Sequence, residues 1–380
     1  MPPSASPEGS LDFLPTRQVR YGPGSISGLP AALDGVGATR VLICTTRSLV
    51  ANGDLLARVR HACGPRLCGQ VSDLPAHVPV AAVEDAASRA RAAGADTLVS
   101  FGGGSVIDAA KAIAARLLDQ GRPVAHIAIP TTLSGAEFAD HFGLTGGAGG
   151  AGGAGGRADS RPVKVTHTRI DVTPSIVILD AHLTAATPAS LWSGTAIKAL
   201  DHAIEGLLCA GGPRPVLDEL ALAGIAAMAA ALPASVHDGA TAMRQRCQIA
   251  AWQCYFAPAS LTLGLSHRIG HVLGGTYGVP HGVTSAVTLP AVMQAMLPTS
   301  RTPLASVAEA LGGSADADAA APMVRALCAE LGLPGRLRDT GIDVADLDRI
   351  AADVAARYPA ALGQLAGGMA ALRQLLADSW

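Results

Sequence analysis

The 380-residue sequence has few aromatic and few charged residues: Phe, Trp and Tyr make up 3% of it, and Asp, Glu, Lys and Arg 15%. Its formal net charge is −2 at pH 7, so no excess of basic residues suggests nucleic acid or an anionic membrane as a partner. Apolar residues make up 49% of the chain, which excludes a disordered or fibrous protein. We therefore expect a packed enzyme with two domains that acts on a small molecule.

The sequence also lacks paired cysteines, a signal peptide and a long apolar run. Its seven cysteines form no CxxC motif, and their odd number and scatter predict a reduced, cytoplasmic protein. The first ten residues, MPPSASPEGS, have neither the basic start nor the apolar core of a signal peptide. No uninterrupted apolar run reaches the roughly 18 residues that a membrane span needs. We therefore expect no membrane partner.

The first half of the sequence alternates apolar strand patterns with helical patterns. Continuous apolar runs predict buried strands at residues 40–45, 97–101, 126–129 and 175–179. This alternation predicts a parallel sheet with right-handed crossovers in a Rossmann-like α/β domain over residues 1–184. Residues 146–156, GGAGGAGGAGG, are interpreted as a flexible insertion at a loop tip, with a functional lid as the alternative.

The second half shows only helical periodicity, which predicts an all-helical catalytic domain over residues 185–380. The predicted helices cover residues 188–210, 213–232, 239–257, 264–273, 283–296, 302–311, 318–331 and 344–378. We expect a ligand in the crevice between the nucleotide-binding sheet and this helical domain.

A glycine-rich motif, FGGGSVIDAAKA, follows a predicted strand and opens a helix. Glycines let a phosphate approach the backbone closely, and a helix N-terminus supplies oriented N–H groups and a partial positive charge. We expect a pyrophosphate at Gly103, Gly104 and Ser105, with Thr131 and Thr132 at the end of the next strand facing the same crevice. The alternative is a tight turn without a ligand, in which the threonines only cap a strand.

A second motif, SHRIGHVLGGTYGVPH, places three histidines within sixteen residues: His267, His271 and His281. The first two are four residues apart and share one face of a predicted helix that ends at Gly274-Gly275. Imidazoles gathered in this way indicate a site for a metal, a proton or a polar substrate. Hydrogen-bonded core histidines are the alternative.

A third motif, SGTAIKALDHAIEGL, places Lys198 and His202 on one helix face, with Glu205 a turn beyond. Asp201 is rotated by about 100° from His202. The lysine is either exposed and unrelated to the site, or the site requires a cation there.

These motifs resemble those of the iron-containing alcohol dehydrogenase superfamily, and within it the maleylacetate reductase branch, over nearly the whole chain. The matching segments are Gly102 to Lys111, Pro130 to Thr132, Asp201 to Glu205 and His267 to Gly282. The resemblance implies a dinucleotide-binding domain, a helical domain, and a hydride transferred in the cleft between them. It also implies NAD(H) or NADP(H) as cofactor and a homodimer.

The resemblance implies that His202, His267 and His281 match the metal-binding histidines of metal-dependent relatives. Those relatives carry an aspartate four residues before the first histidine, where this chain has Lys198. An ammonium cannot ligate a cation and repels it, so we expect no tightly bound metal. Lys198 would instead stabilise the oxyanion formed on hydride transfer, with His202 or His267 as proton source.

The resemblance also assigns roles to further residues. His271 would order the nicotinamide or relay the proton, His281 would complete the catalytic set, and Arg268 resembles a basic substrate-site residue of the branch. The remaining residues implied in cofactor binding are Thr46, Asp108 and Lys164.

Three departures from the family pattern bear on specificity. Ser285 and Ala291 stand where maleylacetate reductases carry further histidines, so another small enone or ketone is as plausible a substrate as maleylacetate. Thr46, followed by Arg47, stands where several relatives carry an aspartate against the ribose, which permits NADP.

The main prediction is therefore an NAD(P)H-dependent reductase that works without metal. The alternatives are an Fe- or Zn-dependent alcohol dehydrogenase, a non-redox lyase or synthase on the dehydroquinate synthase-like architecture, and a binding protein that has lost its activity.

Overall fold

The computed structural model describes residues 9–75, 78–146, 163–209 and 211–380. These residues form two compact units. Among the described residues, the α/β unit comprises those within 13–188 and 239–249, and the helical unit comprises those within 9–12, 189–238 and 250–380. Apart from Gly146, the predicted glycine-rich insertion at 146–156 lies outside the described residues.

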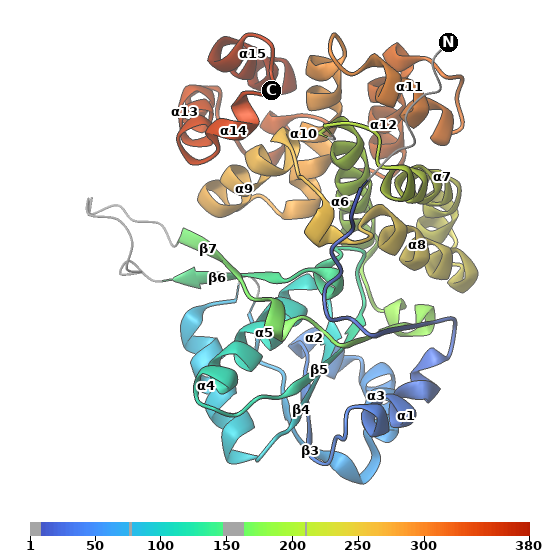
Figure 1. Cartoon of the computed structure of the whole chain (residues 1–380), viewed down its shortest axis with the longest axis vertical. Coiled ribbons are helices and arrows are strands. Elements are labelled where there is room, and N and C mark those ends of the chain that lie inside the picture. The colour runs from blue at the N-terminus through green and yellow to red at the C-terminus, as the bar shows by residue number, and fades with distance from the viewer. Residues whose placement is uncertain (1–8, 76–77, 147–162, 210) are drawn as a thin grey trace. The chain divides into compact units, whose positions relative to one another are not determined.

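The α/β unit is built on a six-stranded parallel sheet, with the strand order β1-β8-β5-β4-β2-β3 (Figure 1). Its strands are β1 (Gln18–Tyr21), β2 (Val41–Cys44), β3 (Leu67–Val71), β4 (Thr97–Gly102), β5 (Ala125–Pro130) and β8 (Ile176–Leu179). A separate antiparallel hairpin pairs β6 (His141–Gly146) with β7 (Val163–Thr168). The predicted fold class, a parallel sheet followed by helices, is confirmed.

Helices cover both faces of this sheet because its central strands are apolar on both sides. Leu42 and Leu98 contribute to a core shared with α4 (Val80–Ala92) and α5 (Gly104–Asp119). Ile43 and Val99 face the opposite core, which includes residues of α1 and α3. The other helices of this layer are α1 (Leu29–Gly35), α2 (Arg47–Ala51) and α3 (Gly53–Cys63).

Two strands of the parallel sheet, β1 and β3, were not predicted from the sequence, and neither were the hairpin strands β6 and β7. The two missed sheet strands lie at its edges. The sequences QVRY and LCGQV mix polar residues and glycine with apolar ones, and most of their residues are partly or fully exposed. An edge strand pairs on one side only, so its sequence need not show the continuous apolar run used to identify strands.

The helical unit is organised around α6 (Ala189–Leu208), which packs against α7, α9 and α10. The other helices from residue 215 onward are α7 (Pro215–His237), α8 (Thr241–Cys254), α9 (Leu265–Tyr277), α10 (His281–Met296), α11 (Arg301–Ala310), α12 (Ala317–Glu330), α13 (Leu347–Arg357), α14 (Pro359–Leu362) and α15 (Gly368–Ser379). The first part of α8 belongs to the α/β unit.

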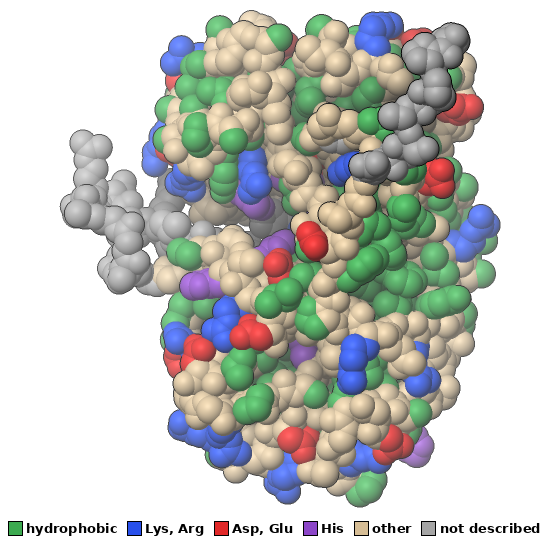
Figure 2. All heavy atoms as spheres, viewed as in Figure 1, with side chains coloured by type: hydrophobic (Ala, Val, Ile, Leu, Met, Phe, Trp, Pro, Cys, Tyr) green, Lys and Arg blue, Asp and Glu red, His purple; other side chains and the backbone are tan. Residues whose placement is uncertain are grey.

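One described helix, α7, is long and apolar enough to cross a membrane, judged by length and composition alone. A single helix of this kind is only weak evidence for a membrane-spanning protein. Val216, near its start, has 51% of its surface exposed, while Ile225 and Met228 are buried in the protein. Basic and acidic side chains are interspersed on the face shown in Figure 2, in keeping with the near-zero net charge.

Two helix predictions were wrong. The helix predicted over residues 344–378 is three helices, because Pro359 starts α14 and Gly367 precedes α15 in a left-handed conformation. The helix carrying the histidines does not end at Gly274-Gly275. It continues to Tyr277 and ends at Gly278, whose φ of 73° is the left-handed C-cap that favours glycine.

Candidate functional site

The first candidate site lies at the carboxyl ends of β2, β4 and β5, which are neighbours in the sheet. From β2 the chain moves outward to β3, whereas from β4 it moves the other way to β5. In parallel sheets the point where the strand order reverses is where ligands bind. Thr46 follows β2, Gly103 follows β4 and Thr131 follows β5, so the structure brings these three predicted residues to one edge of the sheet.

The glycines of the motif are required by close packing. Gly102 has a φ of 156°, and a Cβ there would lie 2.7 Å from Val106 Cγ2. A Cβ on Gly103 would lie 2.9 Å from Thr132 Cγ2, and one on Gly104 would lie 2.8 Å from Ser134 Oγ. The glycines therefore allow the loop after β5 to lie directly against the start of α5.

The start of α5 has the features of a phosphate site. Gly103 is its N-cap and has no side chain to bond the first N–H groups. Val106 and Ile107 donate back to the Gly103 carbonyl at 2.9 and 3.2 Å. Ser105 in the first turn is exposed. The partial positive charge of a sixteen-residue helix at this end suits an anionic ligand.

Other predicted cofactor residues have structural contacts as well. Thr46 caps α2, accepting a hydrogen bond from the Leu49 N–H at 3.3 Å. Asp108 accepts from the Gly143 N–H at 3.3 Å. Thr131 and Thr132 are buried. Lys164 pairs with Thr145 in the hairpin, and the structure describes its backbone but not its side chain.

Lys111, the lysine of the glycine-rich motif, is fully buried rather than presented to a ligand. Its Nζ donates to the carbonyl oxygens of Ala136 and Ala139 at 2.6 Å and of His141 at 3.0 Å. A buried ammonium requires such compensation. Lys111 thus fixes the segment that follows Thr131 and Thr132 against α5.

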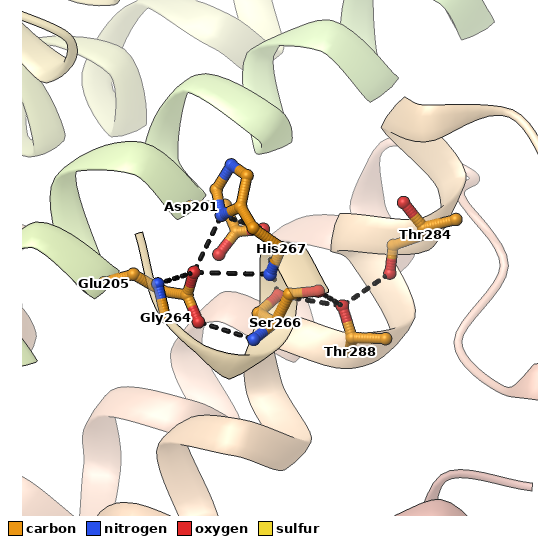
Figure 3. Close-up of polar contacts among 7 residues, drawn as sticks. All are labelled: Asp201, Glu205, Gly264, Ser266, His267, Thr284 and Thr288. Carbon is orange, nitrogen blue, oxygen red and sulfur yellow. Dashed lines mark hydrogen bonds and ion pairs between the residues drawn. The ribbon is translucent and has the colours of Figure 1, made fainter. Parts of the chain in front are cut away.

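The second candidate site is a buried cluster in the helical unit that joins α6, α9 and α10 (Figure 3). Glu205 of α6 accepts hydrogen bonds from the N–H groups of Gly264 at 2.8 Å, Ser266 at 2.5 Å and His267 at 3.3 Å. Its Oε2 also lies 2.7 Å from His267 Nδ1. A carboxylate of α6 therefore caps the start of α9 and contacts its first histidine.

Asp201, one turn before Glu205 on α6, is the second carboxylate of the cluster. Its Oδ2 lies 3.5 Å from His267 Nδ1 and accepts from the Ser266 hydroxyl at 2.9 Å. Ser266 Oγ lies 2.8 Å from Thr288 Oγ1 on α10, and Thr288 donates to the Thr284 carbonyl at 2.9 Å. Hydroxyl groups thus extend the cluster from α9 to α10.

Burial dominates the electrostatics of this cluster. It raises the pKa of Asp201 to about 7 and that of Glu205 to about 7, because an ionised carboxylate loses its hydration. The charge of His267 opposes the rise at Asp201, and the backbone N–H groups of Ser266, His267 and Gly264 oppose it at Glu205.

His202 is on the same helix, but its ring stacks on its neighbours. Its centroid lies 4.7 Å from that of His267, with 19° between the planes, and 4.0 Å from that of Tyr255, with 23°. Imidazole binds metal through a lone pair in the ring plane. Lone pairs of nearly parallel stacked rings do not converge on one tetrahedral ion.

The described residues do not fit a divalent ion. Lys198, at the α6 position where the resemblance implies an aspartate, carries an ammonium that cannot ligate an ion, and the rings of His202 and His267 are stacked. The ligand atoms of Asp201, Glu205 and His267 do lie within 4.8 Å of one another. However, Glu205 Oε2 already accepts from backbone N–H groups, and an ion would have to displace its contact with His267 Nδ1. We derive no step through a metal.

The remaining predicted site residues lie on α6, α9 and α10. Lys198 and His271 are half-buried, and His281 is the first residue of α10, with its side chain not described. The Arg268 guanidinium lies 5.1 Å from the ring centroid of Tyr358, whose hydroxyl lies 3.5 Å from His271 Nδ1. Tyr358, between α13 and α14, therefore contacts both Arg268 and His271, the latter from 87 residues away in the sequence.

Sequence reasoning assigned no role to Asp201, Glu205, Ser266, Tyr255 or Tyr358. The motif around His202 included the two carboxylates, but only the fold brings them against His267. Tyr255 and Tyr358 belong to no motif that the sequence analysis identified.

Comparison with protein families matches both units. Residues 15–181 match the family described as iron-containing alcohol dehydrogenase, and residues 193–364 match the C-terminal domain of the Fe-containing alcohol dehydrogenase family. A maleylacetate reductase from Rhizobium sp. strain MTP-10005 is 32% identical, with 88% of each chain covered. Maleylacetate reductase 1 from Cupriavidus pinatubonensis is 31% identical, with 92% of each chain covered.

Solved structures show the same fold. The crystal structure of maleylacetate reductase from Agrobacterium tumefaciens matches with a TM-score of 0.83 at 28% identity, with 99% of each chain covered. Sulfoacetaldehyde reductase from Bifidobacterium kashiwanohense, solved in complex with NAD+, matches with a TM-score of 0.83 over 98% of this chain and 99% of that one. At 21% identity, the second match shows the fold alone.

Proposed function

The chain belongs to the iron-containing alcohol dehydrogenase family, and we propose that it reduces a small enone or ketone of the maleylacetate type without a metal ion. It is an NAD(P)-dependent oxidoreductase, as its relatives are. One observation carries the metal-free proposal: Lys198 occupies the α6 position at which the resemblance implies an aspartate ligand. The stacked rings of His202 and His267 support the same conclusion.

The α/β unit is proposed to bind the cofactor. The N–H groups at the start of α5, with Gly103, Gly104 and Ser105, would hold the pyrophosphate. The proposed cofactor-binding residues also include Thr46, Asp108, Thr131, Thr132, Lys164 and His271. When bound, the reduced nicotinamide supplies the hydride.

The helical unit is proposed to stabilise the negative charge that forms on the substrate and to supply the proton. Lys198 would stabilise the negative charge that forms on the substrate oxygen, as a fixed positive charge and hydrogen-bond donor in a partly buried position. His267 or His202 would supply the proton. Arg268 would bind a substrate carboxylate, because a guanidinium can donate two parallel hydrogen bonds to one.

The proposal also covers the domain organisation, substrate, cellular location and oligomeric state of the enzyme. Residues 1–184 would form the cofactor domain and residues 185–380 the catalytic domain. The relatives named above are maleylacetate reductases, so an unsaturated oxo-dicarboxylate is the first substrate to test. We also propose that the enzyme is a cytoplasmic homodimer.

The test is stoichiometric oxidation of NADH or NADPH by the purified enzyme with maleylacetate and with simpler enones. We expect one equivalent of reduced cofactor to be oxidised for each equivalent of substrate. A substrate that is converted without net oxidation of the cofactor would instead indicate a lyase or synthase. No turnover of any enone or ketone would contradict the proposed function.

A further inference from the structure

Glu205 is almost completely buried, with 1% of its surface exposed, and its carboxylate oxygens accept hydrogen bonds from backbone N–H groups of α9 and its N-cap (Figure 3). Oε1 accepts from Ser266 N, and Oε2 accepts from Gly264 N and His267 N. A backbone N–H can only donate. Both oxygens of Glu205 are therefore fixed as acceptors by the backbone.

This arrangement determines the role of the nearest imidazole nitrogen. Oε2, which receives two backbone N–H groups, lies 2.7 Å from His267 Nδ1. A proton on Oε2 would point toward groups that already donate to it. The three backbone N–H donors stabilise the ionised form of Glu205 against the burial that raises its pKa, so the short contact places the hydrogen on Nδ1, and in a neutral imidazole the lone pair is then on Nε2.

We infer that Glu205 is a positioning residue: it holds His267 with its hydrogen on Nδ1, so that Nε2 is the nitrogen that exchanges a proton with the substrate. This inference rests on the proposed function, in which His267, protonated on Nε2 as well, gives that proton to the substrate oxygen and is left neutral with its hydrogen on Nδ1. A carboxylate or carbonyl partner commonly fixes the tautomer of a functional histidine in this way.

Glycine at position 264 allows this contact. A Cβ there would lie 2.8 Å from Glu205 Oε1 and 2.6 Å from Cys209 Sγ. With a larger residue there, the Glu205 carboxylate, the Cys209 thiol or the start of α9 would have to shift.

Asp201 is the more distant of the two carboxylates that face His267 Nδ1. Its Oδ2 is farther from His267 Nδ1, at 3.5 Å, and accepts the Ser266 hydroxyl at 2.9 Å. The shorter contact identifies Glu205 as the partner that fixes the ring.

The direct test is nitrogen NMR of the wild-type protein labelled with 15N-histidine, without substrate, at a pH where the rings are neutral. The His267 signals are assigned by their loss in His267→Asn. We expect the hydrogen on Nδ1, and a hydrogen found on Nε2 alone would overturn the inference. Because no turnover is measured, a failed reductase assay leaves this result standing, and a wrong tautomer leaves the reductase function standing.

Two variants separate positioning from helix capping. Glu205→Gln retains an acceptor oxygen that can face Nδ1, although its NH2 group then meets the Ser266 N–H, so we expect a lower Tm but the same tautomer and most of kcat. Glu205→Met removes the acceptor, and we expect kcat to fall about 10- to 100-fold with the KM for NAD(P)H unchanged. A folded Glu205→Met enzyme with wild-type kcat would overturn the inference. If Glu205→Met does not fold, the inference is tested by the His267 tautomer measured in the wild-type protein.

Asp180 provides the matched control. It is also a buried carboxylate, and it accepts from the N–H groups of Gly24 at 2.9 Å, Ile26 at 3.0 Å and His182 at 3.0 Å. It contacts no histidine of the cluster. We expect Asp180→Leu to lower Tm without changing the His267 tautomer, and a change of tautomer in this variant would show that general destabilisation moves the signal.

Discussion

At the scale of single residues, the use of lysine is unusual. The sequence has 28 basic residues but only three lysines, at positions 111, 164 and 198. Lys111 is buried and bonded to three carbonyl groups. Lys198 lies half-buried on α6, the helix that carries Asp201 and Glu205. A compact ammonium at this place can act as a point charge, which the wider guanidinium of arginine does less well.

The first prediction concerns Lys198. Because the proposed role is to stabilise charge in the transition state, we expect Lys198→Ala to lower kcat on the order of 10²- to 10³-fold and to leave the Kd for NAD(P)H nearly unchanged. Steady-state kinetics and cofactor titration measure the two effects. Arg373→Ala, which removes an exposed ion pair with Asp348, is the control. Equal losses in kcat and cofactor affinity, or no loss, would count against this role.

The second prediction concerns His126 in the sheet. Burial lowers the pKa of His126 to about 3, and the charge of Lys111 adds to the effect. As the pH falls below the usual value of 6.5, the unfolded chain gains a proton at this residue and the folded chain does not. Stability that is fully present above pH 6.5 is therefore lost on acidification, by up to about 1.4 kcal/mol per pH unit.

This effect is measured by denaturant unfolding of the wild type and of His126→Gln across that pH range. As the pH falls, we expect the unfolding free energy of the wild type to decrease relative to that of His126→Gln. A difference between the two proteins that does not depend on pH would show that His126 gains its proton at the same pH in the folded protein as in the unfolded chain, which would contradict the prediction.

At the scale of elements, the sequence was informative where strands are buried on both faces and where motifs are continuous. The central strands β2, β4 and β5 were predicted from their apolar runs, and the start of α5 from its glycines. The edge strands β1 and β3 were missed because partial exposure permits polar residues. The bond between Glu205 and His267 spans 62 residues, and no local pattern encodes such a contact.

The third prediction concerns the contact between α5 and the loop after β5. A methyl group on Gly103 would lie 2.9 Å from Thr132 Cγ2, so one of the two must move. We expect Gly103→Ala to weaken NAD(P)H binding roughly tenfold, since overpacking of this kind costs about 1–3 kcal/mol. Isothermal titration with both cofactors measures this loss.

The control for this variant is Gly35→Ala at the end of α1, where an added Cβ meets no atom within 4 Å. We expect its cofactor affinity to equal that of the wild type. Unchanged affinity in Gly103→Ala would mean that the start of α5 does not bind the cofactor.

At the scale of the whole molecule, the chain divides its functional groups between two units. The glycine motif and the strand ends belong to the α/β unit, while Lys198 and the histidines belong to the helical unit. The family match covers both units, at residues 15–181 and 193–364. The family fold is therefore retained, and we propose that the departure from a metal-binding pattern lies in side chains such as Lys198.

The central claim is that an ammonium group, and not a metal ion, stabilises the charge formed on the substrate. The most direct measurement is the metal content of enzyme purified without chelator, combined with kcat before and after treatment with chelator. We predict zinc and iron well below one ion per chain and a kcat that chelation does not change. One tightly bound ion per chain, with activity lost on its removal and restored on its return, would contradict the account.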